Sequence, residues 1–522
     1  MKKVVAILGL CVLLFSNALA QKQRPNILFI MADDHTTQAV SAYGGPLTKV
    51  FQTPNIDRIG NEGIIFENCF VTNSICTPSR ATILTGQYSH HNGVYTLMDP
   101  LNRNHDNVAK RLQAEGYKTA VIGKWHLKSE PSGFDYYNVL KGQGAYTGPT
   151  LKEKGQWEKE GKSFEKARGD RHKGHSTDVI GGLAIDWLKE RNNEESFMLM
   201  CHFKAPHRNW VAAKRFENMF DGVTIPEPES LYEDHTNRSQ WAPKSYNTIR
   251  KDMKPMDLGI RMKYDTLQGS ARTKYAYQLY MKRYLACCAG VDENVGKILD
   301  YLDKSGLAEN TIVVYTGDQG FFLGEHGWFD KRSILEESLR MPLLIRYPKG
   351  IEAGQRNTSL VSNVDFAPTF LDMADAPESK DMDGKSFAPM FEGRMPKNWR
   401  DAFYYRYWMQ LADHGVPAHF GIRTDKYKLI FYYGRGLEKL GTFDRRIDPF
   451  NSNSPQIANT TPEWEFYDLS KDPKEMVNRY TDPEYQKIIR KLKKKLQKER
   501  NSLGDTDDAH PEMEEVIKSY WN

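Results

Sequence analysis

The chain contains little cysteine and, beyond its first twenty residues, no long apolar run. Six cysteines occur among 522 residues, too few for the disulfide framework that holds small secreted domains together. No later segment has the length and apolarity of a membrane helix. Basic and acidic residues nearly balance, at 72 and 67, so the concentrated positive charge typical of nucleic-acid-binding proteins is missing. We therefore expect a large globular protein with no nucleic-acid partner and no transmembrane segment.

The first twenty residues have the pattern of a cleaved secretory signal. They are MKKVVAILGLCVLLFSNALA, with two lysines, an apolar run and the small-residue ending Ala18-Leu19-Ala20. The sequence therefore predicts an exported protein that begins near Gln21, and Cys11 is lost with the signal. Five cysteines remain. Because that number is odd, at least one of them is unpaired or chemically modified.

Short apolar segments alternate with helical patterns along most of the chain. Strands are predicted at 26–31, 118–123, 196–203 and 311–316, and helices at 53–63, 175–191 and 273–304. This alternation is typical of an α/β fold, with a large, mostly parallel sheet sandwiched by helices. The irregular segments 141–163 and 220–268 are predicted to be surface loops, which could roof a substrate cleft.

The character of the sequence changes after Pro396. The aromatic, alternating segments DAFYYRYW and HFGIRTDKYKLIFYY predict an antiparallel sheet. The lysine-rich segment 488–500 predicts an amphipathic helix with a solvated charged face. We therefore predict a signal peptide over 1–20, a catalytic α/β domain over 21–395, and a smaller C-terminal subdomain with a small antiparallel sheet and a terminal helix over 396–522.

Charged and polar side chains follow each of the four predicted strands. In chain order they are Asp33 and Asp34, then Lys124 and His126, then His207, and finally Asp318 and Gln319. Ligands of open α/β sheets bind beyond the carboxyl ends of the strands, so we expect these side chains to share one crevice. The acids and the Gln319 amide offer only oxygen ligands, which favour a hard cation such as Ca²⁺ or Mg²⁺.

Basic groups predict an anion site in the same crevice. Arg80, Lys124 and Lys331 can hold a tetrahedral oxyanion, and the helix that opens around Pro78 favours negative charge at its first turn. The imidazoles of His126 and His207 can transfer protons near neutral pH. A divalent cation, an oxyanion site and proton-transfer groups together predict hydrolysis of a phosphate or sulfate ester.

Cys76 stands at the start of that helix, in the stretch CTPSRATILTG. By residue type alone its thiol is a nucleophile, half of a disulfide, a metal ligand or a packing residue. A soft thiolate beside a hard cation is a poor nucleophile for either ester. However, the stretch resembles the signature of the formylglycine-dependent sulfatase family, Cys-x-Pro-Ser-Arg followed by Thr-Gly. The blocks ADDH, GKWHL, KAPH, GDQGFFLGEHGWFDK and RTDKYKLI are similar to further blocks of that family, in the same order.

The resemblance covers nearly all of the chain after the signal and implies an alkaline-phosphatase-like fold with a small C-terminal sheet domain. It also implies that a maturation enzyme converts Cys76 to formylglycine, whose hydrated form attacks sulfur. The implied Ca²⁺ ligands are that residue, Asp33, Asp34, Asp318 and Gln319, where many family members carry Asn in place of Gln319. The implied catalytic residues also include three cations, Arg80, Lys124 and Lys331, which hold sulfate and stabilise charge. The resemblance further implies that His207 protonates the leaving alcohol and that His126 removes a proton from the second hydroxyl.

The implied substrate is a sulfated glycan of the glycosaminoglycan or mucin type. The blocks SAYGG, YSHHNGV and KAPHRNW are similar to those of exported, periplasmic bacterial glycan sulfatases such as the N-acetylglucosamine-6-sulfatases. This points to 6-O-sulfated N-acetylglucosamine, with a sugar-binding rim that we predict from His90, His91, Arg208, Asn209 and Trp210. The alternatives are another sulfated sugar position, a phosphate or phosphonate ester hydrolase of the same superfamily, and a non-catalytic protein that binds sulfated glycans.

Overall fold

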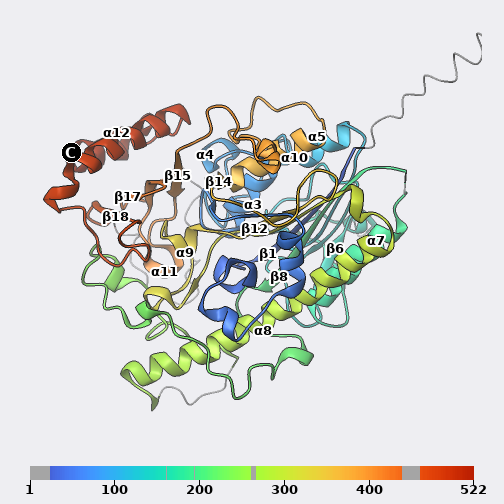
Figure 1. Ribbon diagram of the computed structural model, residues 1–522, viewed down its shortest axis with the longest axis horizontal. Coiled ribbons are helices and arrows are strands. Elements are labelled where there is room, and N and C mark those ends of the chain that lie inside the picture. The colour runs from blue at the N-terminus through green and yellow to red at the C-terminus, as the bar shows by residue number, and fades with distance from the viewer. Residues whose placement is uncertain (1–23, 160, 193, 260–265, 438–458, 522) are drawn as a thin grey trace, which may run out of the picture.

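The four predicted strands lie next to one another in the centre of one large sheet. The structure is a computed structural model that describes residues 24–159, 161–192, 194–259, 266–437 and 459–521 (Figure 1). The four strands are β1 (Asn26–Asp33), β4 (Lys118–Gly123), β8 (Phe197–Pro206) and β9 (Thr311–Gly317). Their order is β9-β1-β8-β4, and each neighbouring pair is parallel. The four carboxyl ends therefore meet at one edge, as the sequence predicts.

Six more strands extend this sheet to ten. They are β2 (Ile64–Phe66), β5 (Tyr136–Leu140), β6 (Thr150–Glu153), β7 (Asp170–Arg171), β12 (Leu343–Arg346) and β13 (Gln355–Asn357). The strand β5 continues the parallel series beside β4, whereas β12 runs antiparallel to β9 and β6 antiparallel to β5. The sheet is thus parallel at its centre and mixed at its margins, which confirms the predicted fold class.

Helices cover both faces of the sheet because the residues of β1 alternate between two cores. Ile27, Phe29 and Met31 pack into one core, and Leu28, Ile30 and Ala32 into the other. The first core lies under α3 (Cys76–Thr85), α5 (Val108–Ala114) and α10 (Phe366–Met373). The second lies under α2 (Pro54–Asn61), α7 (Ser176–Glu190) and α8 (Gly269–Lys304). Figure 1 shows the two groups of helices on opposite sides of the strands.

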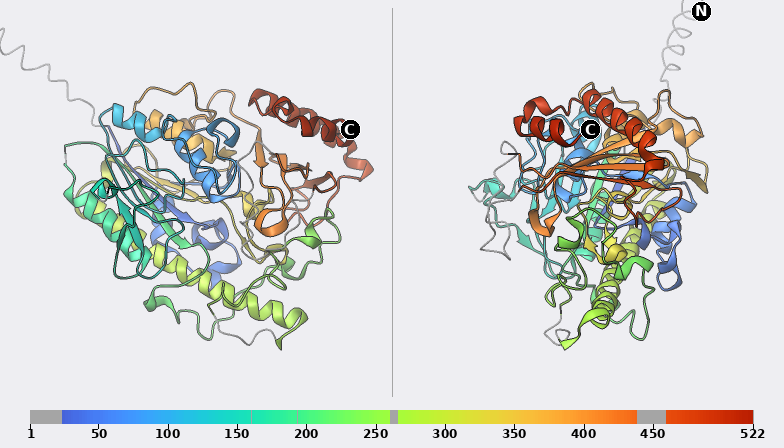
Figure 2. Two further views of the ribbon diagram at one scale, coloured as in Figure 1. Left: turned by 180° about the vertical axis from the view of Figure 1, so that it is seen from behind. Right: turned by 90° about the vertical axis from the view of Figure 1, so that its left-hand side faces the viewer.

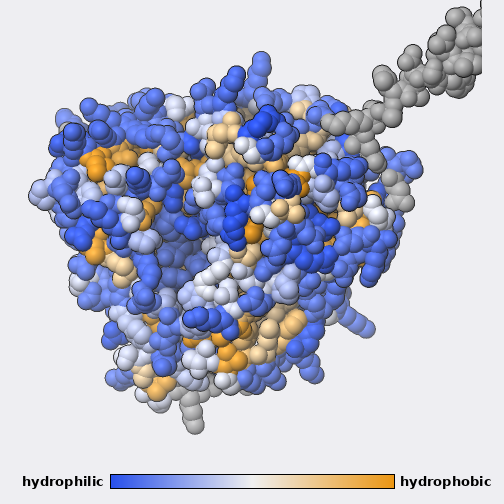
Figure 3. Space-filling model, in the orientation of Figure 1, coloured by the Kyte–Doolittle hydropathy of each residue, from blue (hydrophilic) through white to orange (hydrophobic). Residues whose placement is uncertain are grey.

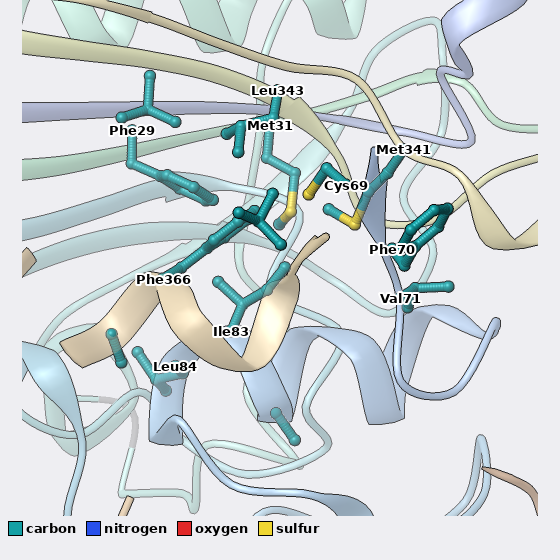
Figure 4. Packing of buried hydrophobic residues seen from close by; sticks show 14 of the residues in the cluster. Phe29, Met31, Cys69, Phe70, Val71, Ile83, Leu84, Met341, Leu343 and Phe366 are labelled. Carbon is teal, nitrogen blue, oxygen red and sulfur yellow. The ribbon is translucent and has the colours of Figure 1, made fainter. Parts of the chain in front are cut away.

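The packing of α3 fixes the helix on which Cys76 lies. Figure 4 shows Ile83 and Leu84 of this helix against Phe366 and the sheet residues Phe29 and Met31. All ten residues of α3 are buried, so the helix has no solvent-facing side. Its N-terminus is thereby held at the edge where the four strands end.

The C-terminal part forms a separate antiparallel sheet, as predicted. Its strands are β15 (Ala402–Tyr407), β16 (His419–Thr424), β17 (Tyr427–Tyr432) and β18 (Glu463–Asp468). The terminal helices α12 (Gln486–Ser502) and α13 (Pro511–Tyr520) pack on it (Figure 2). The lysine-rich helix α12 buries Ile489, Leu492 and Leu496. Four of its lysines, Lys487, Lys491, Lys494 and Lys498, are exposed, which confirms the predicted solvated face, whereas Lys493 is buried against the ring of Trp464. The boundary at residue 396 stays a proposal.

The remaining short elements connect these layers. They are β3 (Cys69–Phe70), β10 (Phe322–Leu323), β11 (Phe329–Asp330), β14 (Val361–Ser362), α4 (Ser89–Asn92), α6 (Gln156–Lys159), α9 (Glu336–Leu339) and α11 (Ala412–Gly415). The prediction that 141–163 is only surface loop is wrong in part. This segment contains β6 and α6, because Leu151 pairs with Leu140 of β5 and Trp157 stacks on Tyr137.

The cysteines and the helices of the described part of the chain agree with the large globular protein that the composition predicts. Cys69, Cys76, Cys201, Cys287 and Cys288 are buried and form no disulfide in the described part of the chain. Among the described helices, none combines the length and the apolarity needed to cross a membrane. The face seen in Figure 3 is mainly hydrophilic, with small scattered apolar patches. The predicted signal peptide, including Cys11, lies outside the described residues.

Candidate active site

The carboxyl ends of β1 and β9 bring four oxygen-bearing side chains together. Asp33, Asp34, Asp318 and Gln319 are each at most 1% exposed. The Asp34 backbone N–H donates to Asp318 Oδ1 over 3.0 Å. Gln319 Nε2 donates to Asp318 Oδ1 over 2.6 Å and also to Asp34. The predicted metal-ligand set therefore forms one buried cluster.

Three oxygens of this cluster fit a cation. Asp33 Oδ1, Asp34 Oδ2 and Gln319 Oε1 are buried and accept no hydrogen bond from any residue that the structure describes. A buried oxygen without a partner costs free energy that a bound cation would recover. Asp33, Asp34 and His207 also offer ligand atoms that all lie within 4.8 Å of one another. This arrangement suits a divalent cation held by carboxylate and amide oxygens, with His207 at the border of the site.

The electrostatics of the carboxylates point the same way. Burial raises the pKa of Asp34 to about 7, and the neighbouring Asp33 and Asp318 add to that rise. Burial and Asp33 likewise raise the pKa of Asp318. For Asp33, burial is outweighed by the charges of Lys124 and Arg80, which hold its pKa well below the ordinary value. Three carboxylates this close repel one another unless a cation neutralises them.

The predicted anion-binding cations surround this cluster and pair with it. Lys124 Nζ contacts Asp33, and Lys331 Nζ contacts Asp34. Arg80 Nη2 lies 2.9 Å from Asp318 Oδ2, and its Nη1 donates to the Lys124 carbonyl over 2.6 Å. All three cations are nearly inaccessible to solvent. The structure therefore brings Arg80, Lys124 and Lys331 to one place, where an oxyanion could bridge them.

Cys76 lies at the first residue of α3, next to this charged cluster. Its Sγ lies 3.3 Å from His126 Nδ1. Ser79, in the first turn of α3, donates its hydroxyl to the Asp318 carbonyl and accepts a hydrogen bond from Asn363 Nδ2 over 3.1 Å. Burial raises the pKa of the Cys76 thiol, and Lys124 and Lys331 oppose this only in part. A free thiol here stays protonated at neutral pH and is a weak nucleophile.

The two predicted proton-transfer histidines flank the cluster. His207 Nε2 lies 3.9 Å from Asp34 Oδ2, and its Nδ1 lies 2.5 Å from the Arg208 carbonyl. Burial and the charge of Lys124 lower the pKa of both His126 and His207 well below the ordinary value. Both imidazoles are therefore neutral at pH 7 while no anion is bound. A neutral His126 beside residue 76 is in the correct protonation state to accept a proton from it.

A cavity of about 560 Å³ opens beside His207. It is lined by Gln143, Gly144, Ala145, Tyr146, Thr147, Lys204, His207, Arg208, Asn209 and Val211. The loop at 141–147 thus helps to enclose it, as predicted for this segment. Tyr146 donates its hydroxyl to the His207 carbonyl over 2.5 Å. This cavity is the space in which a substrate can reach the histidine.

Several further residues of this region have no role predicted from the sequence. Lys204 is 4% exposed, and burial together with Lys124 lowers its pKa to about 8. Asp330, next to Lys331, lies 3.1 Å from His414 Nε2 and 3.5 Å from Arg208 Nη1. Lys204 and Asp330 stand inside the family-like blocks KAPH and GDQGFFLGEHGWFDK, so their places in the sequence were a usable signal. No such signal marked His414, because it lies in α11, far from Asp330 in the sequence.

The predicted sugar-binding residues divide into two groups. Arg208 and Asn209 line the cavity, as expected. Trp210 is 1% exposed and its ring packs on Tyr280, with 4.6 Å between centroids. His90 Nε2 lies 2.8 Å from the Leu503 carbonyl, and His91 Nδ1 lies 2.8 Å from Asp383. Among the described residues that line the cavity, none of these three occurs, and their substrate role stays a prediction without support from the contacts.

Comparison with known proteins agrees with this geometry. The sulfatase family profile matches residues 25–376, and the profile of the N-sulphoglucosamine sulphohydrolase C-terminal region matches residues 324–461 and 455–502. An N-acetylglucosamine-6-O-sulfatase of Bacteroides thetaiotaomicron is 41% identical over 95% of this chain and 89% of its own. The human N-acetylglucosamine-6-sulfatase is 28% identical over 77% of this chain and 71% of its own.

Solved structures show the same relationship. A structure in complex with its substrate D-glucosamine-2-N,6-O-disulfate matches with a TM-score of 0.82 and 40% identity, over 94% of this chain and 100% of the other. The phosphonate monoester hydrolase of Agrobacterium radiobacter matches with a TM-score of 0.68 and 22% identity, over 92% of this chain and 96% of its own. The second likeness shows a shared fold only.

Proposed function

Because this chain belongs to the sulfatase family, we propose that it removes the 6-O-sulfate of N-acetylglucosamine or glucosamine units in sulfated glycans. The observation that carries the substrate is the 41% identity to an N-acetylglucosamine-6-O-sulfatase along almost the whole chain. The reaction itself fits the site, where a cluster of buried acids is ringed by three cations and two neutral histidines.

The proposed mechanism assigns a task to each of these side chains. Asp33, Asp34, Asp318 and Gln319 would hold a divalent cation, Ca²⁺ in view of the oxygen donors. That cation supplies positive charge for the sulfate, and a formylglycine made from Cys76 supplies the nucleophilic oxygen. Arg80, Lys124 and Lys331 bind sulfate oxygens and stabilise the charge that develops on them. When sulfate binds, each of these three cations gives up part of its contact with a carboxylate and contacts a sulfate oxygen instead.

The histidines move protons on opposite sides of the sulfate. His126, 3.3 Å from the side chain of residue 76, accepts a proton from that side chain. His207 borders the cavity and donates a proton to the ester oxygen of the departing sugar. The bound sulfate ester adds negative charge next to His207, which raises its pKa and favours the protonated form that this step needs.

Export and maturation complete the proposal. The signal-like first twenty residues support an exported, periplasmic protein. The match of CTPSR to the family signature supports a maturation enzyme that oxidises Cys76 before or during export. Both are properties of the precursor chain, and both can be checked on protein purified from its native host.

Sulfate release from a panel of monosulfated sugars tests the substrate. The panel contains N-acetylglucosamine sulfated at O3, O4 or O6, galactose 6-sulfate, and N-acetylglucosamine 6-phosphate. We expect turnover of the 6-O-sulfated N-acetylglucosamine, with the Cys76→Ala variant as the inactive control. Faster release of phosphate would favour the phosphate ester hydrolase of the same superfamily. Tight binding of the sulfated sugars by fully matured protein without any release would favour a non-catalytic glycan-binding protein.

A further inference from the structure

A lysine without a carboxylate partner faces the cavity beside His207. Lys204 lines this cavity and is 4% exposed. Its Nζ lies 4.8 Å from the centroid of the Tyr146 ring. Within the described parts of the chain, no hydrogen bond or ion pair joins this ammonium to an acidic group. A buried ammonium in this situation is costly, and an anion supplied by a ligand would offset that cost.

The other cations of the site differ from Lys204 in this respect. Lys124 contacts Asp33, Lys331 contacts Asp34, and Arg80 lies 2.9 Å from Asp318. Each of these charges is already balanced by a carboxylate of the acidic cluster. Lys204 is directed instead at open space between the loop 143–147 and the segment 207–211. It is therefore the cation most available to an additional negative group.

The position of the cavity decides which part of the substrate meets Lys204. The proposed function makes His207 the proton donor to the ester oxygen, and His207 is part of the cavity wall. The group that continues beyond that oxygen into the cavity is the sugar. Lys204 thus lines the space that the leaving sugar and its substituents enter.

Resting on that proposed function, we infer that Lys204 binds a second anionic group of the glycan, one that the reaction leaves in place. The group is a sulfate on the same sugar or a carboxylate on the neighbouring one. Arg208 lines the same cavity, but its guanidinium lies 3.5 Å from Asp330, so its charge is shared. The aromatic ring of Tyr146 limits how far the Lys204 side chain can swing, which fixes the place where the anion binds.

Three 6-O-sulfated substrates test this inference on the matured enzyme. They are N-acetylglucosamine 6-sulfate, glucosamine 2-N,6-O-disulfate, and a disaccharide of N-acetylglucosamine 6-sulfate with a uronic acid. We expect kcat/KM to be about tenfold higher or more for at least one of the doubly charged substrates, through a lower KM, because charge-assisted hydrogen bonds are the stronger ones. The arm that shows the preference identifies the sulfate or the carboxylate as the group bound.

The variants separate binding from a structural effect. In Lys204→Met the ratio of kcat/KM between the preferred and the singly charged substrate falls to about one. In Lys204→Arg most of the ratio is kept, and in the exposed control Lys214→Met it does not change. The wild type turning over all three substrates equally, or Lys204→Met losing activity equally on all three, would overturn the inference alone. No sulfate release from any of them would overturn the proposed function and the inference with it.

Discussion

The Sγ of Cys76 lies 3.3 Å from Nδ1 of His126, at the mouth of a fully buried helix. The two residues come from different layers: Cys76 opens α3, and His126 follows β4. Their contact places a neutral imidazole next to the side chain from which the proposed nucleophile is made. The other charged groups of the site lie around this pair.

Replacing His126 should slow the chemical step and leave substrate binding in place. We expect His126→Gln to lower kcat by about 10²- to 10⁴-fold with little change in KM, because general base catalysis is typically of this size and the sulfate-holding cations remain. Steady-state kinetics on N-acetylglucosamine 6-sulfate measure both constants. His172→Gln, outside the cavity lining, is the control. A rise in KM with unchanged kcat would show that His126 binds substrate instead.

Removing one acid of the cluster should remove the metal. Asp318→Asn is expected to lose bound divalent cation and at least about 100-fold in activity, because the ion and Arg80 both depend on this carboxylate. Metal analysis of the purified protein and melting curves with and without a chelator provide the readout. A cation whose free concentration is 100 times its Kd stabilises the folded state by about 2.7 kcal/mol. Chelation should therefore lower the melting temperature of the wild type.

The matched control for this prediction is Asp186→Asn. Asp186 is exposed and pairs with Lys189 over 3.1 Å on the surface of α7. This variant should keep its metal and its response to the chelator. The assignment of the cluster as a metal site would be contradicted by matured wild-type protein that carries no divalent cation. In that case its melting temperature would change with neither Ca²⁺ nor chelator.

His419 should make stability depend on pH. It is fully buried in β16, and burial lowers its pKa from 6.5 to about 4. Below pH 6.5 the unfolded chain binds a proton that the folded protein does not, so stability falls as pH drops from 6.5 toward 4. The loss amounts to roughly 3 kcal/mol over that window.

Denaturant unfolding of the wild type and His419→Gln at pH 7.5, 6.0 and 5.0 tests this. The variant should lose less stability than the wild type on going from pH 7.5 to 5.0, whatever its stability at pH 7.5. His172→Gln should follow the wild type. Parallel curves for wild type and His419→Gln would mean that His419 is not held neutral in the folded protein.

A buried ion cluster joins the C-terminal sheet to the catalytic domain. Lys428 of β17 is inaccessible to solvent and lies 2.9 Å from Glu336 and 2.7 Å from Glu475. Lys428→Met should cost about 3–5 kcal/mol, because it leaves the buried carboxylate of Glu475 without its cation, whereas Glu336 keeps Arg340 and Arg423. Thermal unfolding gives the readout. The exposed Lys471→Met should change the melting temperature little, and equal effects of the two variants would contradict this role of Lys428.

The sequence predicted the site residues best where they come directly after a strand. Asp33, Lys124, His207 and Asp318 each come within a few residues of an apolar strand end, and the parallel order of those strands brings them together. Contacts between distant segments gave no such signal. His414 reaches Asp330 across 84 positions of the chain, and nothing local marks either residue as part of a pair.

Aromatic residues were the least predictable from the sequence. Trp210 stands in the polar stretch KAPHRNW and was expected on a sugar-binding rim. It is buried instead because the long helix α8 presents Tyr280 to its ring. Conversely Tyr146, in a loop, contacts Lys204 and His207 from the cavity wall. Burial of a single aromatic side chain depends on what packs over it, and local sequence does not contain that information.

Mass spectrometry of the peptide that carries residue 76, on active enzyme from the native host, tests the central claim most directly. The account predicts an aldehyde in place of the Cys76 thiol, in a fraction that rises and falls with sulfatase activity toward N-acetylglucosamine 6-sulfate. An unmodified thiol at position 76 in fully active enzyme would contradict it.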